Sequence, residues 1–556
     1  MAPSIRVLVV AAVIHADGAA QQVVRASVDS SGVEATDWSR WPTLSGNGRF
    51  VSFLSAAPNL VAGDANGGCD VFVYDRNSGT TECVSVDPNG VPGNDASGQW
   101  GGAPASMSFD GRYVAFASNA TNLLVGRTTL SSGVFLRDRQ SGTTELISVD
   151  SHGVEGHGNA YGSSMSDDGN IVVFDSDADD LVANDTNHRL DVFVHDRATG
   201  VTERISVDSS GVESNGDNFY PQVSGDGRLV AFTSAATNLV SGDGNGAWDA
   251  FVHDRQSGTT TRVSVDSSGV EANGVSAAIA FSRDGSTVAF WSNAANLVSG
   301  DGNGFIDVFV HEVESGITER VSVDSFGNEG DGQSDLSALS SDGRMVAFTS
   351  GATNLVAGDT NGTWDVLLHD RSTGTTVLRS LDPSGIQGDD GSGYPSISAD
   401  GGSIAFESWA DNFAPGDSNG TGDIFVRDDH DASWTNYGSG FAGTNGVPSI
   451  TAQQDPVLGT SLTVAVGNSY GQPTVGLLLV GFARANFHTG FGGDVLLIPA
   501  LVVPITFSYG ADSFSGAVPS DVTLAGVTLD VQAIESDPGA ALGVSFSEGL
   551  ELSFGF

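Results

Sequence analysis

The sequence predicts an all-β protein, and three observations support that prediction. Glycine is abundant, with 74 among 556 residues, whereas long charged runs and helix-period patterns are scarce. The phrase Ser-Val-Asp-Ser-Ser-Gly-Val-Glu and its variants recur along most of the chain. An Asp-Gly or Asn-Gly pair follows each phrase at a nearly constant spacing, and such pairs are typical of hairpin turns between short strands.

The repeat is about 58 residues long. The intervals between successive phrase aspartates are 58 residues, except for one of 63 residues in the second copy. The five extra residues of that copy lie before its Asp-Gly turn, around residues 96–103. The phrase aspartates are Asp29, Asp87, Asp150, Asp208, Asp266, Asp324 and Asp382.

Each copy has the pattern of four short strands. In the fourth copy these strands are expected at residues 220–224, 229–234, 250–254 and 260–265. We expect the Asp-Gly pair between the first two strands to form a type I′ turn, in which both central residues have positive φ. Four-stranded units with a period above 40 residues predict a β-propeller, because each unit buries its faces only against its neighbours.

The two ends of the repeat region complete one another. The first three strands occur in seven copies, but the seventh copy has no good fourth strand. Residues 22–28, at the chain start, have the pattern of a fourth strand and precede any first strand. We therefore predict a seven-bladed β-propeller over residues 21–435, closed by this N-terminal strand, because closure removes two open sheet edges.

Two motifs in the repeats carry a family resemblance. Residues 224–232 and 340–348 read Ser-x-Asp-Gly-x-x-Val-Ala-Phe, and residues 191–196 read Asp-Val-Phe-Val-His-Asp. Over about residues 22–432 the chain resembles the TolB-like, PD40 (WD40-like) family of bacterial propeller repeats. The resemblance implies the fold. It implies little about function, because family members include interaction platforms and propellers attached to hydrolases.

Residues 436–556 break the repeat. A glycine-rich hinge at 437–446 is followed by strand-like runs such as 461–466 and 475–480, which predict a small C-terminal β-sandwich. This part resembles a C-terminal module found on secreted proteins of environmental bacteria, including a closing Glu-x-Asp-Pro-Gly-Ala style segment at 535–541. The resemblance implies no activity for this domain.

The N-terminus predicts export. A basic start, an eight-residue apolar core and a small-residue end make residues 1–20 a signal peptide, with an ordinary first strand as the alternative. No other stretch is long and apolar enough to span a membrane, so we expect a secreted, periplasmic or cell-surface protein without a transmembrane segment. Cys69 and Cys83 are the only cysteines, and a disulfide and two free thiols are both open.

The charge excludes one class of partner. The formal net charge is −46 and there is no lysine. Nucleic-acid binding needs a basic surface, so it is excluded, and anionic membranes repel this chain. Cations and basic partners are attracted.

The connection between the second and third strands has the pattern Asp-x-Asn-Gly-x-x-Asp. Carboxylate and amide oxygens on a tight glycine loop are the ligands that calcium prefers. The alternative is a metal-free Asx turn, since Asp and Asn bond their own backbone and Asn-Gly accepts positive φ. The candidate metal ligands are Asp64, Asn66, Asp70, Asp185, Asn187, Asp191, Asp243, Asn245, Asp249, Asp301, Asn303, Asp307, Asp359, Asn361, Asp365, Asp417, Asn419 and Asp423.

Three details limit the calcium interpretation. Fuller calcium loops carry another acidic residue two positions before the first aspartate, and no copy has one. The third copy has His188 in place of the glycine. The second copy has Arg127, Thr129 and Gly133 at the three ligand positions, so we expect no site there.

The strand order predicts one acidic face, where these loops meet five glutamates of the connections between copies. These are Glu34, Glu155, Glu213, Glu271 and Glu329. On the opposite face, the His-Asp-Arg triplets at His195, His253 and His369 are interpreted as turn caps and surface ion pairs. The Gly-x-Ser-x-Gly match at 467–471 is interpreted as chance, because it lacks the strand-to-helix context of a nucleophile elbow.

These observations predict an exported, non-enzymatic propeller that acts as a binding platform for a protein or a polysaccharide. Calcium is its one candidate cofactor, and no catalytic residue is assigned. One alternative is a metal-assisted hydrolase, lactonase or lyase that uses the acidic face. A second alternative is a cell-surface structural protein.

Overall fold

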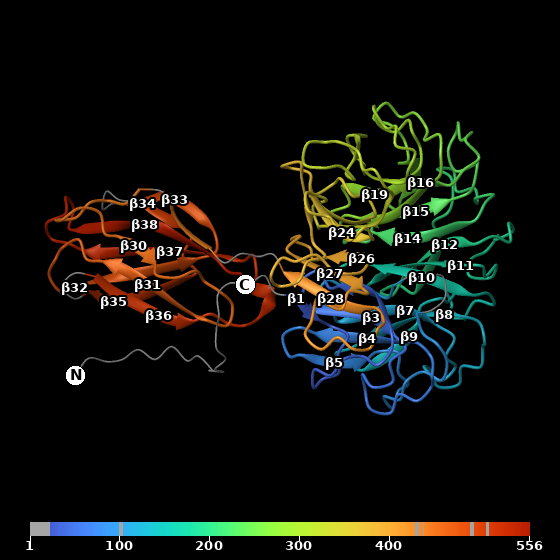
Figure 1. The fold of residues 1–556 in the computed structure, drawn as a ribbon, viewed down its shortest axis with the longest axis horizontal. Coiled ribbons are helices and arrows are strands. Elements are labelled where there is room, and N and C mark those ends of the chain that lie inside the picture. Colours follow the sequence, from blue (N-terminus) through green and yellow to red (C-terminus); the bar gives the residue numbers. More distant parts are fainter. Residues whose placement is uncertain are drawn as a thin grey trace. The chain divides into compact units, whose positions relative to one another are not determined.

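The computed structural model of the protein describes residues 23–98, 104–428, 433–437, 439–489, 494–507 and 511–555 (Figure 1). The expected signal peptide, at residues 1–20, lies outside the described residues. The prediction of an all-β chain is confirmed, because the described residues form strands and a single three-residue 3-10 helix, Val522–Leu524. They divide into two compact units, one spanning Val23–Arg427 and the other beginning at Asp428.

The first unit contains seven four-stranded antiparallel sheets among its described residues. We number them sheet 1 to sheet 7 in chain order. Sheet 1 is β2 (Ser39–Leu44), β3 (Phe50–Ser55), β4 (Asp70–Asp75) and β5 (Thr80–Cys83). Sheet 2 is β6 (Ser106–Met107), β7 (Tyr113–Ser118), β8 (Gly133–Asp138) and β9 (Thr143–Leu146). Sheet 3 is β10 (Ala160–Met165), β11 (Ile171–Ser176), β12 (Asp191–Asp196) and β13 (Val201–Arg204).

The remaining four sheets repeat the same antiparallel arrangement of four strands. Sheet 4 is β14 (Asn218–Val223), β15 (Leu229–Ser234), β16 (Asp249–Asp254) and β17 (Thr259–Arg262). Sheet 5 is β18 (Ser276–Phe281), β19 (Thr287–Ser292), β20 (Asp307–Glu312) and β21 (Thr318–Arg320). Sheet 6 is β22 (Ser334–Leu339), β23 (Met345–Ser350), β24 (Asp365–Asp370) and β25 (Thr375–Leu378). Sheet 7 is β26 (Ser392–Ile397), β27 (Ser403–Ser408), β28 (Asp423–Asp428) and β1 (Val23–Arg25).

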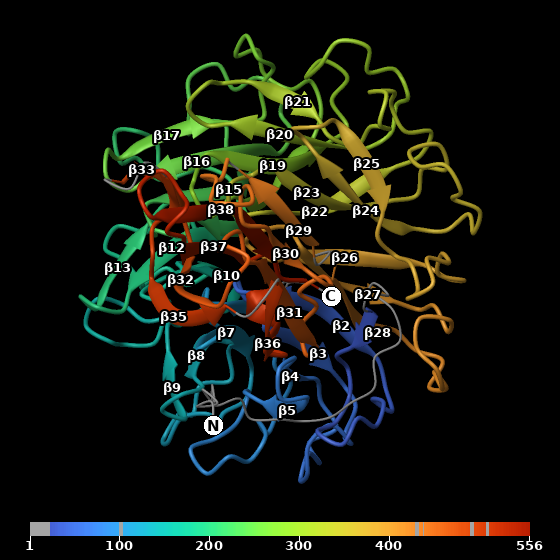
Figure 2. The ribbon, with the colours of Figure 1, turned by 90° about the vertical axis from the view of Figure 1, so that its left-hand side faces the viewer.

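Contacts between the first strands run through all seven sheets. The series β2, β6, β10, β14, β18, β22 and β26 makes contact from each strand to the next, and β26 contacts β2. Figure 2 shows the fourth strands β5, β9, β13, β17, β21 and β25 following one another around the outside of the first unit. The fourth strand of sheet 7 comes from the chain start, since β1 pairs antiparallel with β28 and places Arg25 opposite Phe425. This is the pairing that the incomplete seventh copy predicted.

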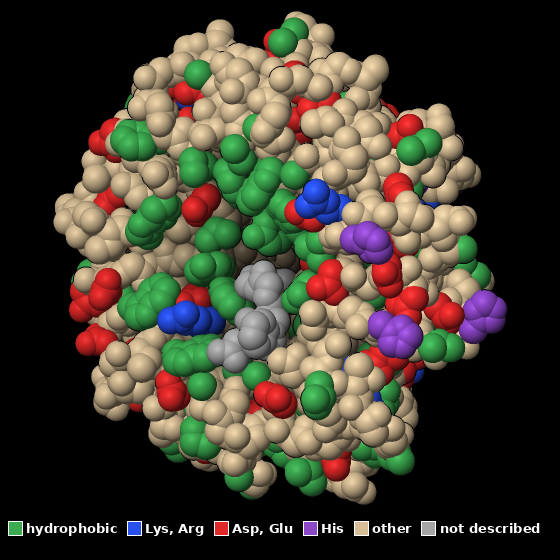
Figure 3. Space-filling view, turned by 90° about the vertical axis from the view of Figure 1, so that its right-hand side faces the viewer, with side chains coloured by type: hydrophobic (Ala, Val, Ile, Leu, Met, Phe, Trp, Pro, Cys, Tyr) green, Lys and Arg blue, Asp and Glu red, His purple; other side chains and the backbone are tan. Residues whose placement is uncertain are grey.

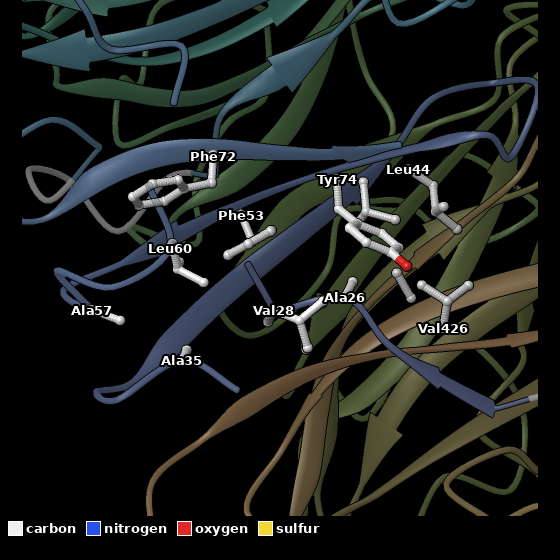
Figure 4. Close-up of a cluster of buried hydrophobic side chains, with 13 residues drawn as sticks. Ala26, Val28, Ala35, Leu44, Phe53, Ala57, Leu60, Phe72, Tyr74 and Val426 are labelled. Atoms are coloured by element: carbon white, nitrogen blue, oxygen red, sulfur yellow. The ribbon is translucent and has the colours of Figure 1, made fainter. Parts of the chain in front are cut away.

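The core lies between neighbouring sheets. Where sheet 7 meets sheet 1, Ala26 and Val28 pack with Phe53, Phe72 and Val426 (Figure 4). Phe53 and Phe72 stack across paired strands with ring centroids 5.8 Å apart, and a similar pair recurs in sheets 2 to 5. Burying one such side chain contributes about 1.5–3 kcal/mol, so the repeated phenylalanines hold adjacent sheets together.

The expected type I′ turns are wrong. In sheet 4, Gly227 N–H donates to Ser224 O at 2.9 Å, and among these turn residues only Gly227 has positive φ, at 74°. Asp226 Oδ1 accepts from Ser224 Oγ at 2.7 Å and from Arg228 N–H at 2.9 Å. The aspartate therefore stabilises a longer loop with its side chain, whereas a type I′ turn would need it in a left-handed conformation.

The described residues of the second unit form three antiparallel sheets. Its core includes Ile450, Val466, Phe507 and Leu550. The five-stranded sheet is β29 (Ser433–Tyr437), β38 (Val544–Ser553), β37 (Thr528–Ser536), β32 (Thr474–Gly481) and β35 (Leu501–Phe507). The others are β30 (Ile450–Ala452), β31 (Ser461–Gly467) and β36 (Ala511–Ala517), and the pair β33 (Arg484–His488) and β34 (Asp494–Leu497).

Two further features bear on the sequence expectations. Cys69 and Cys83 are free thiols, and burial raises the pKa of both. None of the helices among the described residues is long and apolar enough to cross a membrane.

Candidate functional site

The repeated acidic loops fold around their asparagine. In sheet 4, Asn245 Oδ1 accepts from Ala247 N–H at 2.6 Å, and its amide nitrogen donates to Ala272 O at 3.0 Å. The same two contacts recur at Asn66, Asn187, Asn303, Asn361 and Asn419. Each asparagine therefore closes an Asx turn and ties the loop to the connection that follows the fourth strand.

The last aspartate of each loop is buried at the start of the third strand. Asp249 is 0% exposed, and its Oδ1 accepts from Ser264 Oγ at 2.6 Å. Burial raises the pKa of Asp249 to about 6, and it does the same for Asp70 and Asp365. The serine partners the carboxylate inside the sheet, so this aspartate is part of the sheet structure.

An arginine occupies the centre of the acidic group in sheet 4. Arg262 Nη1 lies 2.5 Å from Glu271 Oε1, 3.6 Å from Asp249 Oδ2 and 3.8 Å from Asp243 Oδ2. The equivalent arginines Arg25, Arg204 and Arg320 contact the equivalent acids in sheets 7, 3 and 5. The predicted meeting of loops and glutamates on one face is thus observed, with a guanidinium between them.

The fourth strands of the other three sheets have no arginine at this position. In sheet 2, Arg127 comes from the loop itself and its Nη2 lies 2.8 Å from Glu155 Oε1. In sheet 6, Gln387 replaces the glutamate, and its amide donates to Asp359 at 3.0 Å and Asp365 at 2.8 Å. In sheet 1, Cys83 and Pro92 stand at the positions of the arginine and the glutamate.

The donor sets decide whether a cation fits. In two described groups, Asp243–Asp249–Glu271 and Glu34–Asp417–Asp423, oxygens of three carboxylates lie within 4.8 Å of one another. Each group is contacted by its own arginine, Arg262 in the first and Arg25 in the second. Calcium needs six to eight oxygens, whereas the asparagine oxygens are already bonded and the guanidinium supplies the positive charge. Residues arranged in this way do not fit calcium in these two groups. The calcium prediction for the loops as a whole stays a prediction.

A second feature of this face was missed by sequence reasoning. Trp41, Tyr220, Leu336 and Tyr394 hold the same position in their first strands and have φ of 54°, 57°, 42° and 52°. The strand register shifts at these residues, as between Phe219 and Gln222. A bulge of this kind re-aims a side chain, and left-handed backbone at bulky residues concentrates at functional sites.

The bulge of sheet 4 borders a pocket of about 530 Å³ between sheets 3 and 4. Phe219 packs edge-on against Tyr220 with ring centroids 5.3 Å apart and against Trp248 at 4.7 Å. Figure 3 shows hydrophobic side chains gathered toward the middle of one face, with charged side chains farther out. The pocket is lined by Tyr161, Gly162, Asp175, Asp177, His188, Arg189, Leu190, Asp217, Phe219, Tyr220 and Trp248.

Polar groups in the pocket are held by local contacts. Asp217 Oδ2 lies 3.7 Å from Arg189 Nη1, and Asp177 Oδ1 accepts from Asn159 N–H at 2.5 Å. Asp175 is 5% exposed, and burial raises its pKa to about 7. The pocket therefore offers aromatic faces together with acceptors, a guanidinium and a carboxyl group that is half protonated near neutral pH.

The other sequence motifs are structural. His253 Nδ1 lies 2.9 Å from Thr260 Oγ1, and its ring is buried; His195 and His369 repeat this contact. Ser469 Oγ donates to Glu535 Oε2 at 2.8 Å, while His488 pairs with Asp494 at the surface. Within the described residues these contacts join Ser469 to carboxylates and not to His488, as expected for a chance motif.

Comparisons with known proteins add little to this description. No family model and no curated protein matches the chain. Among solved structures, a TolB protein from Agrobacterium tumefaciens is 16% identical over 51% of this chain and 80% of its own, with a TM-score of 0.32. The periplasmic gluconolactonase of Pseudomonas aeruginosa is 17% identical over 61% of this chain and 84% of its own, with a TM-score of 0.31. At these values the likenesses carry no inference about activity.

Proposed function

We propose that this protein is an exported binding protein for an uncharged polysaccharide. In this proposal the seven sheets are the blades of a closed β-propeller completed by β1, and the second unit is a small β-sandwich. The observation that carries the proposal is the pocket between sheets 3 and 4, lined by Tyr161, Phe219, Tyr220 and Trp248 beside three aspartates.

The chemistry of the pocket favours a sugar. The C–H faces of a sugar ring are apolar and flat, so they stack on aromatic rings such as those of Tyr220 and Trp248, which are 44% and 40% exposed. Sugar hydroxyls can donate to the carboxylates of Asp177 and Asp217, and Arg189 can donate to a ring or hydroxyl oxygen. A net charge of −46 disfavours polymers of uronic acids, and the stacking surfaces of the pocket require no charge on the sugar, so the proposal takes an uncharged polysaccharide.

The acidic loops have a positioning part in this proposal. Trp248 directly precedes Asp249, whose carboxylate is fixed by Ser264 and Asn245. Arg262 ties the same loop to Glu271 in the next connection. In this proposal the loops therefore position the aromatic side chains of the pocket.

A glycan array tests the proposal. We expect wild-type protein to be retained on uncharged glycans and not on uronic acid polymers. Tyr220→Ala and Trp248→Ala should each weaken retention about tenfold or more, since loss of one stacking contact of about 1.4 kcal/mol is tenfold in affinity. Phe326→Ala is the matched control, because Phe326 is 91% exposed and does not line the pocket.

Two outcomes contradict the proposal. Equal retention of wild-type protein and Tyr220→Ala would remove the pocket from the binding surface. Retention on a peptide library in place of glycans would replace the polysaccharide by a protein partner.

A second candidate function is hydrolysis of the bound chain. The observation that favours it is Asp175, a buried acid with its pKa raised to about 7, which shares the pocket with Asp177 and Asp217. A carboxyl group with a raised pKa beside a second carboxyl group is the pairing that glycoside hydrolysis uses. Release of reducing ends by wild-type protein, lost in Asp175→Asn, would establish it; absence of release from every retained glycan excludes it.

A further inference from the structure

A second carboxylate occupies the position of Asp175 in another sheet. Asp175 is the fifth residue of β11, and Glu407 is the fifth residue of β27. The other five sheets have apolar residues or threonine at this position: Leu54, Ala117, Thr233, Trp291 and Thr349. Packing of the sheets therefore does not require an acid here.

Glu407 is buried next to Arg40, and one of its carboxylate oxygens has no hydrogen-bond partner. Its side chain is 1% exposed, and its Oε1 lies 3.6 Å from Arg40 Nε but accepts no hydrogen bond. Its Oε2 accepts from Trp41 N–H at 3.4 Å. Burying a carboxylate oxygen without a hydrogen-bond partner is unfavourable, so this acid is not there for the stability of the sheet.

Aromatic side chains surround this pair. The Arg40 guanidinium lies over the rings of Trp38, at 5.2 Å, and Trp409, at 5.9 Å. The rings of Trp41 and Tyr394 have centroids 6.4 Å apart. The backbone of both residues has a positive φ, like that of Tyr220 beside the pocket. Trp409 and Tyr394 are 37% and 38% exposed, so their faces are accessible.

The two carboxylates stand on opposite sides of the ring. Around the series of first-strand contacts, sheets 3 and 7 are separated by two sheets in one direction and by three in the other. Both positions are at the same level of their sheets, because each acid is followed by the serine that ends the second strand. The pocket and the Glu407 surroundings therefore border the same end of the ring.

We propose that Arg40, Trp41, Tyr394 and Trp409 form a second sugar subsite, in which the buried Glu407 positions Arg40, and that one long polysaccharide chain contacts both the pocket and this subsite. The inference rests on the proposed function and adds a second point of attachment. The exposed rings of Tyr394 and Trp409 stack on a sugar, and the Arg40 guanidinium, whose side chain is 43% exposed and is held from the buried side by Glu407, donates to one of its oxygens. Attachment at both ends raises the affinity for long chains above that of either subsite, because the second contact becomes intramolecular.

Calorimetric titration with oligosaccharides of the linkage retained in the array tests the inference. We expect a short oligosaccharide to bind wild-type protein at two sites, and a long one to bind once and more tightly. Trp409→Ala should remove one of the two short-chain sites and lower the long-chain affinity about tenfold or more. Tyr394→Ala should have the same effect, which guards against a single variant that fails to fold, and the melting temperature of each variant is measured.

The outcomes separate this inference from the proposed function. One short-chain site in wild-type protein, removed by Tyr220→Ala, together with unchanged long-chain binding in Trp409→Ala, overturns the second subsite and leaves the first intact. Absence of binding by wild-type protein overturns both, and this is visible before any variant is made.

Discussion

Arg262→Gln removes the positive charge at the centre of the acidic group in sheet 4. The side chain of Arg262 is 9% exposed, and those of Asp243 and Asp249 are 2% and 1% exposed. Removing one partner of a buried ion pair costs about 3–5 kcal/mol. We expect a value near the lower end, because Glu271 is 20% exposed and water screens part of its charge. The melting temperature of the first unit, measured by calorimetry above pH 7, should fall accordingly.

The same variant should gain affinity for calcium. Asp243, Asp249 and Glu271 place oxygens within 4.8 Å of one another, and without the guanidinium they have no positive partner. Calcium at a hundred times its dissociation constant adds about 2.7 kcal/mol, so it should restore much of the lost stability. The melting temperature of wild-type protein, treated first with a chelator, should not rise when calcium is added.

The control is Arg228→Gln in the same sheet. Arg228 is 50% exposed and pairs with Asp254 at 2.7 Å, an exposed contact of about 0–1 kcal/mol. It should change neither the melting temperature nor the response to calcium appreciably. An Arg262→Gln protein as stable as wild type would refute the reasoning. A calcium shift in the wild type would instead favour metal-loaded loops.

Two further predictions concern stability. The pKa values of Asp70, Asp249 and Asp365 are raised to about 6, so the folded state binds protons more tightly than the unfolded state, and stability should be gained as pH falls from 8 to 5. The pKa values of Asp254 and Asp370 are lowered by Arg228 and Arg344, so the stability that these two aspartates contribute is lost below about pH 4. The melting temperature, plotted against pH, should therefore be highest between about pH 4 and 5. A melting temperature that rises steadily from pH 5 to 8 contradicts this. Gly227→Ala should cost about 1–3 kcal/mol more than Gly258→Ala in thermal unfolding. Both glycines have positive φ, but a Cβ at Gly227 would lie 2.5 Å from Ile171 of the preceding sheet, whereas Gly258 has no neighbour within 4 Å. Equal losses would show that the turn does not pack as described.

The repeat made the sheets and the pairing of β1 with β28 predictable, because each copy supports the strand assignment of the others. The arginine at the centre of the acidic loops was visible as a covarying pair. Arginine precedes glutamate by nine residues in four copies, as in Arg262 and Glu271; both are absent in copies one and six, and copy two keeps Glu155 but has Leu146 at the arginine position. That the guanidinium enters the loop depends on how the fourth strand pairs, so the spacing alone did not reveal it.

The aromatic pocket was not predictable in the same way. Only Tyr394 among the counterparts of Tyr220 is also a tyrosine, and the orientation of Tyr220 depends on a bulge and a positive φ that no local sequence preference favours. The type I′ turns failed for a related reason. The Asp226 side chain bonds Ser224 and Arg228, and these contacts outweigh the general preference of Asp-Gly pairs.

The most direct test of sugar binding at this face is calorimetric titration of one long, uncharged oligosaccharide into wild-type protein and into the double variant Tyr220→Ala, Trp409→Ala. The account predicts measurable binding to the wild type and none to the double variant, with similar melting temperatures for both proteins. Equal heats of binding from the two proteins would contradict it.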